Sequence, residues 1–139
     1  MTVADLARRD PIAATRKASI AEVAALMRDE GVGSIVIEED DRPVGIVTDR
    51  DITVAVTAEA RDPHEVTAED VMTENPITVD VDTGVTELVE LMAEHGVRRM
   101  PVVDGDDLYG IITLDDLARL LVDEQQSLSA VIEAESPPY

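Results

Sequence analysis

Two short stretches of the sequence end an apolar run with the same pair of polar residues. The first reads Gly-Ile-Val-Thr-Asp-Arg-Asp-Ile from Gly45, and the second reads Gly-Ile-Ile-Thr-Leu-Asp-Asp-Leu from Gly110. The pairs are Thr48 with Asp51 and Thr113 with Asp116. The simplest interpretation is a helix-capping box, in which the helix dipole also favours the carboxylate. The same geometry suits a nucleotide, because a fixed carboxylate can accept from ribose hydroxyls while a hydroxyl and backbone N–H groups suit a phosphate.

These stretches lie at an offset of 65 residues, and the first half of the chain repeats in the second at that offset. The register needs no gap from Asp5 to Ala55, which indicates a tandem repeat of one supersecondary unit. Each unit predicts an extended segment after a proline, an amphipathic helix, two strands joined by an acidic turn, and a second helix. A single unit leaves one face of its sheet uncovered. We therefore expect an α+β (mixed α/β) fold of two β-α-β-β-α units, packed through their sheets with pseudo-two-fold symmetry and two clefts at the seam.

The repeat divides the chain into four parts: a first repeat at 2–56, a linker at 57–66, a second repeat at 67–122, and an extension at 123–139. The extension continues a helical pattern that runs from Leu117 to Ala134 before Pro137 and Pro138, and we expect it to be a helix that contacts another subunit. The expected helix ends are Ser19 with Glu22 and Thr83 for the two starts, and Gly31 and Gly96 for the two C-terminal caps.

The composition excludes several classes of protein. Asp and Glu total 31 against 11 Lys and Arg, which gives a net charge of −20 and disfavours binding to DNA or RNA. A basic protein partner is one explanation of this charge; life in concentrated salt is the explanation we favour, and it suggests a haloarchaeal cytoplasm. The chain has no cysteine and no apolar run near the ~20 residues of a membrane span, so we expect a soluble, cytoplasmic protein.

The duplicated unit resembles a tandem pair of cystathionine β-synthase (CBS) domains. The resemblance rests on the two Gly-x-x-Thr-x-x-Asp stretches in one register and on Gly-Val-Arg-Arg-Met-Pro-Val-Val from Gly96, and it covers residues 2–122. It implies a stand-alone, non-catalytic module that binds AMP, ADP, ATP or S-adenosylmethionine between the repeats and forms a disc-like homodimer. It also implies that each cleft combines the Thr-x-x-Asp corner of one repeat with two segments of the other.

By this resemblance, the first cleft, which we call cleft A, would be formed by Ile46, Thr48, Asp51, Ile77, Thr78, Val97, Arg98, Arg99 and Pro101. The second, cleft B, would be formed by Ile111, Thr113, Asp116, Ile12, Ala13, Val32, Gly33, Ser34 and Val36. The backbone at Thr78 or Ala13 would read the adenine edge. The chain has no Phe or Trp, so aliphatic side chains would have to enclose the base.

The two clefts are not expected to be equivalent. Arg98 and Arg99 of cleft A align with Gly33 and Ser34 of cleft B, so the sequence predicts two guanidinium groups in cleft A and none at the matching positions of cleft B. We expect Arg50 to be the positive group of cleft B. Its counterpart in the second repeat is Asp115, which we expect on the other side, in cleft A. Cleft A is therefore expected to be the tighter site for a phosphorylated ligand, although Arg98 and Arg99 could instead pair with surface carboxylates.

Other candidate sites are weaker. His64 and His95 have no metal-ligating neighbour at a suitable spacing, and the turn at 104–107 lacks the later Gly and Glu of a calcium loop. No pattern indicates a nucleophile with its base, so the sequence does not predict an enzyme. The leading hypothesis is a regulatory module that binds an adenine nucleotide and acts on a protein target. The alternative is an interaction or scaffold protein with vestigial clefts, which would act through its dimer surface or C-terminal helix.

Overall fold

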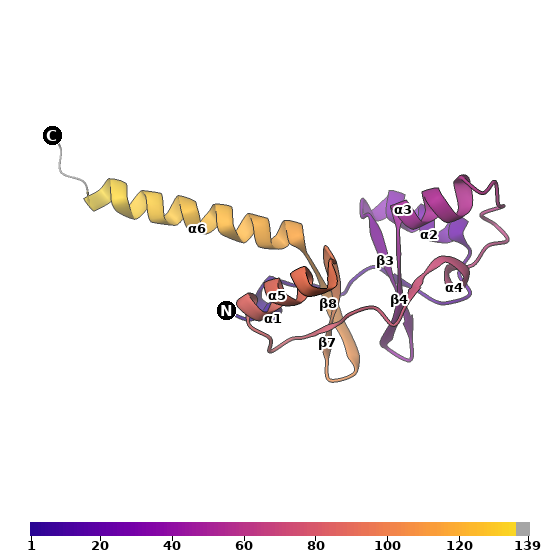
Figure 1. The fold of residues 1–139 in the computed structure, drawn as a ribbon, viewed down its shortest axis with the longest axis horizontal. Coiled ribbons are helices and arrows are strands. Elements are labelled where there is room, and N and C mark those ends of the chain that lie inside the picture. The colour runs from indigo at the N-terminus through magenta and orange to yellow at the C-terminus, as the bar shows by residue number, and fades with distance from the viewer. Residues whose placement is uncertain (136–139) are drawn as a thin grey trace.

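The computed structural model describes residues 1–135 of the chain as two similar units, each with its own sheet (Figure 1). The first unit contains β2 (Ala13–Ala14), α2 (Ile20–Glu30), β3 (Ser34–Glu39), β4 (Arg42–Thr48), α3 (Asp49–Ile52) and the π-helical turn η1 (Thr53–Thr57). The second contains β6 (Val79–Asp80), α5 (Val85–His95), β7 (Arg99–Asp104), β8 (Asp107–Thr113) and α6 (Leu114–Glu135). Four short elements precede the units: α1 (Val3–Leu6) and β1 (Arg8–Arg9), then α4 (Ala68–Val71) and β5 (Thr73–Glu74). The duplicated mixed α/β unit is thus confirmed.

Each sheet takes an edge strand from the segment that precedes the other unit. The strand orders are β2-β3-β4-β5 and β1-β8-β7-β6, with β5 antiparallel to β4 and β1 antiparallel to β8. The short helices cross over as well: Val3 of α1 belongs to the core of the second unit, whereas Ala68 and Met72 belong to that of the first. The crossover ties the two units together and places β1 beside the end of β8.

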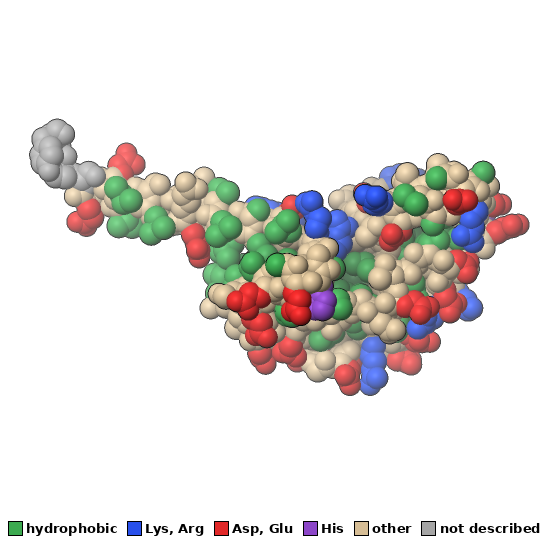
Figure 2. Space-filling model, viewed as in Figure 1, with side chains coloured by type: hydrophobic (Ala, Val, Ile, Leu, Met, Phe, Trp, Pro, Cys, Tyr) green, Lys and Arg blue, Asp and Glu red, His purple; other side chains and the backbone are tan. Residues whose placement is uncertain are grey.

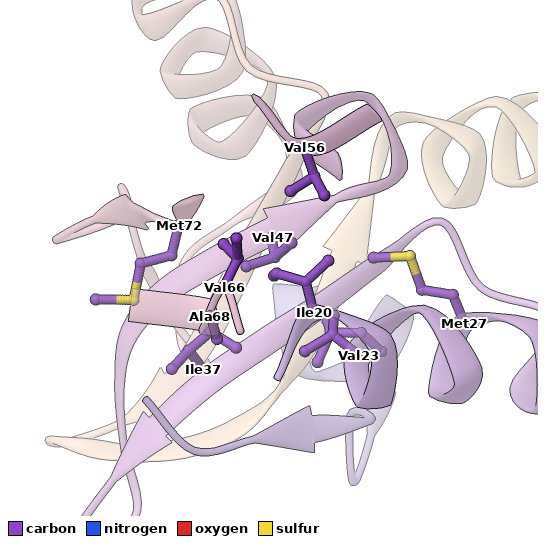
Figure 3. Close-up of a cluster of buried hydrophobic side chains, with 10 residues drawn as sticks. Ile20, Val23, Met27, Ile37, Val47, Val56, Val66, Ala68 and Met72 are labelled. Atoms are coloured by element: carbon purple, nitrogen blue, oxygen red, sulfur yellow. The ribbon is translucent and has the colours of Figure 1, made fainter. Parts of the chain in front are cut away.

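The two hydrophobic cores lie between each sheet and its helices. Figure 3 shows the first, where Ile20 and Val23 of α2 meet Ile37 of β3, Val47 of β4 and the crossing residue Met72. Because side chains alternate along a strand, the neighbours of these strand residues point to the opposite face of the sheet. On these opposite faces lie Val36 of β3 in the first sheet and Pro101 of β7 in the second. Both are fully buried, and neither belongs to a core cluster. They fill the seam at which the sheets pack, as the sequence predicts.

The helix ends follow the local sequence with one exception. Ser19 accepts from the Glu22 N–H at 3.1 Å, and Gly31 and Gly96 end their helices with φ values of 65° and 62°. The prediction that Thr83 caps α5 is wrong, because Gly84 occupies that position and makes no side-chain bond. The carbonyl of Thr83 accepts instead from the Val3 N–H at 2.8 Å, so this residue anchors the crossing helix α1.

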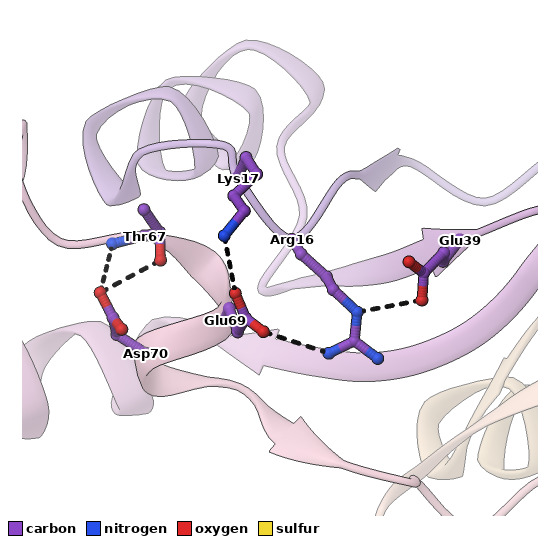
Figure 4. Close-up of polar contacts among 6 residues, drawn as sticks. All are labelled: Arg16, Lys17, Glu39, Thr67, Glu69 and Asp70. Atoms are coloured by element: carbon purple, nitrogen blue, oxygen red, sulfur yellow. Dashed lines mark hydrogen bonds and ion pairs between the residues drawn. The ribbon is translucent and has the colours of Figure 1, made fainter.

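Polar contacts hold the other crossing helix, α4, against the first unit (Figure 4). Arg16 contacts Glu39 at 3.1 Å and Glu69 of α4 at 3.7 Å, while Lys17 reaches Glu69 at 3.3 Å. Lys17 and Glu39 are more than half exposed and Arg16 and Glu69 are partly exposed, so each pair contributes at most about 1 kcal/mol. The buried contacts of Ala68 and Met72 therefore hold α4 more strongly than its ion pairs do.

The long helix α6 continues β8 and extends away from both units (Figure 1). It runs to Glu135, through most of the segment predicted to be a helical extension, while Pro137 and Pro138 lie outside the described residues. Leu121, Leu128 and Val131 are at least 60% exposed, and Figure 2 shows hydrophobic side chains along this helix. Across residues 1–135, no helix combines the length and apolarity required to cross a membrane.

Candidate functional site

Both Thr-x-x-Asp corners form capping boxes at the starts of helices. The Thr48 N–H donates to Asp51 Oδ2 at 2.8 Å, and the Asp51 N–H donates to Thr48 Oγ1 at 3.1 Å. In the second unit, the N–H and hydroxyl of Thr113 both donate to Asp116 Oδ2 at 3.0 Å. The structural explanation of the motif is therefore correct, and a ligand-binding role would have to use the groups that capping leaves accessible.

The second carboxylate oxygen differs between the two corners. Asp116 Oδ1 lies 3.3 Å from Arg8 Nε and 3.6 Å from Arg119 Nη2, and the Asp116 side chain is only 8% exposed. Asp51 makes no ion pair with any part of the chain that the structure describes. The carboxylate of the first corner is therefore the freer one to meet a ribose.

Cleft A is a cavity of about 390 Å³ at the seam. It is lined by seven of the nine predicted residues, together with three from the crossing segment, Thr73, Asn75 and Pro76. The seven are Ile46, Thr48, Ile77, Val97, Arg98, Arg99 and Pro101. Asp51 and Thr78 do not line this cavity. They lie close in sequence to Thr48 and Ile77, which do. Its two arginines face no acidic residue in the lining.

Cleft B is a cavity of about 420 Å³ on the other side of the seam. Seven of its predicted residues line it, namely Ile12, Val32, Gly33, Ser34, Val36, Ile111 and Thr113. Ala13 and Asp116 are absent from the lining, and Asp116 is turned into its contacts with Arg8 and Arg119.

The positive groups of cleft B are not the predicted ones. Arg50 is exposed on α3 and does not line the cavity, so its assignment to cleft B stays a prediction. Asp115 does line cleft B, together with Thr113 of the same helix start. The guanidinium groups come instead from Arg8, Arg9 and Arg99. Arg99, predicted for cleft A, lines cleft B as well.

Two features of the fold bring these arginines to cleft B. The crossover sets Arg8 opposite Ile111 and Arg9 opposite Gly110 on β8. Arg99 begins β7 and reaches across the seam, where its Nη1 donates to the Gly33 carbonyl at 3.1 Å. The sequence does carry a signal for the crossing helix, since Thr2 and Asp5 form a capping box just before Arg8 and Arg9.

The charges around the two clefts are balanced differently. Cleft B sets its three arginines against three acids, Asp10, Glu30 and Asp115. Arg8 is also paired with Asp116, and Arg9 lies over the ring of Tyr109 at 4.8 Å from its centroid. Cleft A presents two arginines and no acid. Cleft A is therefore the more positive site, although it has fewer arginines. Figure 2 shows basic side chains gathered in the hollow between the two units.

Neither cleft provides a metal site. Within residues 1–135, no three His, Cys, Asp or Glu side chains are close enough together to hold a metal ion. Cleft A, with mainly aliphatic walls and two arginines, is typical of a binding site for a small organic ligand, whereas the wall of cleft B combines aliphatic residues with six charged ones. The volumes of both cavities fall in the range of about 300–1,000 Å³ that such sites occupy.

Comparison with known proteins decides the family. The family model described as CBS domain matches residues 3–58 and again residues 68–123. The chain belongs to the CBS domain family. The two matches coincide with the two units of the fold, so the chain is a tandem CBS pair.

The relatives of this CBS pair include proteins from archaea and bacteria. "Uncharacterized protein MK0525" of Methanopyrus kandleri is 40% identical over 141 residues, which cover all of this chain and 70% of that protein. Hypoxic response protein 1 of Mycobacterium tuberculosis is 36% identical over 104 residues, which cover 74% of this chain and 73% of that protein.

Solved structures share the arrangement. The CBS domain pair of protein MJ0100 in complex with 5′-methylthioadenosine and S-adenosyl-L-methionine superposes with a TM-score of 0.80 at 29% identity, over 89% of this chain and 98% of that one. Hypoxic Response Protein I with two coordinated zinc ions gives a TM-score of 0.78 at 32% identity, over 86% and 98% of the two chains. A related CBS pair therefore binds adenosyl compounds.

Proposed function

We propose that this CBS pair is a non-catalytic regulatory module that binds an adenosyl ligand in the clefts between its repeats. The observation that carries the proposal is that both repeats contribute walls to each cleft. A ligand that fits one packing of the repeats better than another would shift the module toward that packing, at a typical coupling of about 1–3 kcal/mol. The adenosyl ligands of the related MJ0100 pair support this ligand class.

Within this proposal, the ligand is AMP, ADP, ATP or S-adenosylmethionine, and the base lies between aliphatic side chains. Ile77 and Pro101 line cleft A, while Ile12 and Ile111 line cleft B. The backbone beside Ile77 or Ile12, at Thr78 or Ala13, would read the adenine edge. Asp51 and Asp116 remain the proposed ribose partners, with Asp51 the less encumbered. We assign the phosphorylated ligand to cleft A because its arginines face no acid in the lining.

A thermal-shift screen with AMP, ADP, ATP and S-adenosylmethionine tests the proposal. A ligand present at 100 times its Kd stabilises the folded chain by about 2.7 kcal/mol, which is a measurable rise in Tm. We expect at least one of the four to raise Tm. No shift with any of them would favour the scaffold alternative, in which the module acts through its dimer surface or through α6.

We further propose that the module is a cytoplasmic homodimer that signals to a protein target, and that its acidic surface is suited to concentrated salt. Mutual repulsion at a net charge of −20 opposes the compact state, and added salt screens it. Tm is therefore expected to rise from 0.1 M to 2 M KCl. A Tm that falls over this range would contradict the halophilic interpretation without affecting the ligand proposal.

A further inference from the structure

Arg99 is the one arginine, among the residues that the structure describes, that lines both clefts. It begins β7, and the structure places its guanidinium at the seam. Nη1 donates to the Gly33 carbonyl at 3.1 Å, which sets this end of the side chain beside the wall of cleft B. Arg98, its neighbour, lines cleft A alone. A single charged group thus borders two sites that the fold otherwise keeps apart.

The carbonyl that receives Arg99 is itself connected to cleft A. The Gly33 carbonyl also accepts from the Asp49 N–H at 3.0 Å, and Asp49 directly follows Thr48, which lines cleft A. The related contact in the second unit runs from the Leu114 N–H to the Arg98 carbonyl at 2.7 Å. Among the described residues no arginine side chain donates to that carbonyl, because Ser34 occupies the position of the first repeat that matches Arg99. The link between the clefts is therefore built on one side of the pseudo-two-fold axis only.

We propose that Arg99 couples the two clefts, so that a phosphate bound in one lowers the affinity of the other for a second phosphate. This inference rests on the proposed function. The physical reason is that one guanidinium charge serves two sites. A phosphate in cleft A draws Arg99 away from the Gly33 carbonyl. Cleft B then keeps Arg8 and Arg9, which are already engaged with Asp116 and with the Tyr109 ring.

The proposal distinguishes ligands by charge. AMP carries a phosphate and competes for the guanidinium, whereas 5′-methylthioadenosine presents the same adenosyl group without a phosphate. Negative coupling is therefore expected for AMP and not for 5′-methylthioadenosine. Couplings between two sites in proteins are commonly about 5- to 150-fold in affinity.

A calorimetric cycle measures the coupling. Ile77→Trp fills cleft A and Ile12→Trp fills cleft B, so each variant reports the AMP association constant of the remaining cleft while the other is blocked. If the clefts are independent, the product of these two constants equals the product of the two stepwise association constants of the unmodified protein. We expect the stepwise product to be at least fivefold smaller than the product from the two variants. If Ile12→Trp does not fold, Val32→Trp blocks the same cleft, and circular dichroism checks each variant.

The same cycle in two further backgrounds tests the residue. In Arg99→Ser, which installs the residue found at the matching position of the first repeat, the two products should agree within twofold. In Arg98→Ser, the deficit should persist, because Arg98 borders only cleft A. Equal products in the unmodified protein, a larger stepwise product, or an unchanged deficit in Arg99→Ser would each overturn the proposal. Absence of binding by AMP, ADP, ATP and S-adenosylmethionine would instead contradict the proposed function itself.

Discussion

Cleft A and cleft B are formed by one repeated sequence, yet they offer a ligand different charges. Both have a capped Thr-x-x-Asp corner and aliphatic walls. Cleft A adds two arginines without an acid, whereas cleft B adds three arginines with three acids. Most of the difference arises outside the motif, at the start of β7, at the end of α2 and in the segment that crosses over as β1, and one acid, Asp115, lies within it. The repeated corner is thus common to both clefts, while the charge around it differs.

The crossover segments also differ in how tightly they pack against the repeated glycines. A Cβ on Gly110 would collide with the Arg8 backbone of β1, whereas a Cβ on Gly45 would collide with the flexible side chain of Met72. The backbone of a paired strand cannot rotate away from an added methyl group, whereas a methionine side chain can change its rotamer. The two sides of the seam are therefore expected to respond unequally to the same substitution.

The largest effect expected is the loss of stability in Gly110→Ala. We predict that the free energy of unfolding falls by about 3 kcal/mol, the upper part of the range for overpacked sites, because β1 must move away from β8. Gly45→Ala is the matched control and should cost about 1 kcal/mol, because Met72 can adopt another rotamer. Urea denaturation measures both. Equal losses would show that the packing of β1 and β5 does not differ as described.

The carboxylates of the two corners provide the next comparison. Asp116→Ala removes a cap and the ion pairs to Arg8 and Arg119, which are themselves more than half exposed, so we expect a loss of about 2 kcal/mol, about 1 from the cap and about 1 from the pairs. Asp51→Ala removes the cap alone and should cost about 1 kcal/mol. Titration calorimetry with AMP on the same pair should show the greater loss of affinity in Asp51→Ala. Equal losses of affinity in the two variants would contradict the assignment of the phosphorylated ligand to cleft A.

The smallest effect concerns the crossing helix α4; it is present at neutral pH and is lost in acid. The Thr67 backbone N–H and then its hydroxyl donate to Asp70, and they lower the pKa of this carboxyl below its usual 3.8. A lowered pKa means that the stabilisation is present above pH 3.8 and is lost as pH falls through the folded-state pKa. Asp70→Asn should therefore have a slightly lower urea midpoint at pH 7, and this gap should close in acid. A gap that stays constant down to pH 2.5 would show that Asp70 does not act through its charge.

Much of the fold can be predicted from local sequence. The parts that cannot be predicted in this way have identifiable physical causes. The repeat, the amphipathic helices and the Gly31 and Gly96 caps are specified by periodicity and by residue type. The edge strands β1 and β5 have two residues each, too few for an alternating pattern, and their partners lie in the other unit. Thr83 is a good cap by residue type, but tertiary contact with Val3 uses its carbonyl instead.

The candidate site also contains residues that the sequence can assign and residues that it cannot. Residues on the long strands, such as Ile46 and Pro101, could be assigned to a cleft from the repeat alone, because the strand register fixes where they lie. Arg8 could not, since it reaches cleft B through the crossover. The position of Arg99 also depends on tertiary structure, because its long side chain spans the seam. Charge balance in the clefts is thus a property of the assembled pair and not of either repeat.

We propose that cleft A is the tighter site for an anionic adenosyl ligand. Arg98 lines only cleft A and Arg8 lines only cleft B, so this pair of arginines separates the two sites. In calorimetric titrations with AMP, Arg98→Ser should weaken the tighter site at least tenfold, as expected for the loss of a hydrogen bond to a charged group worth about 1.5–3 kcal/mol. Arg8→Ser should leave that site within twofold of the unmodified protein. A tenfold loss in Arg8→Ser with no change in Arg98→Ser would place the tighter site in cleft B and contradict the account.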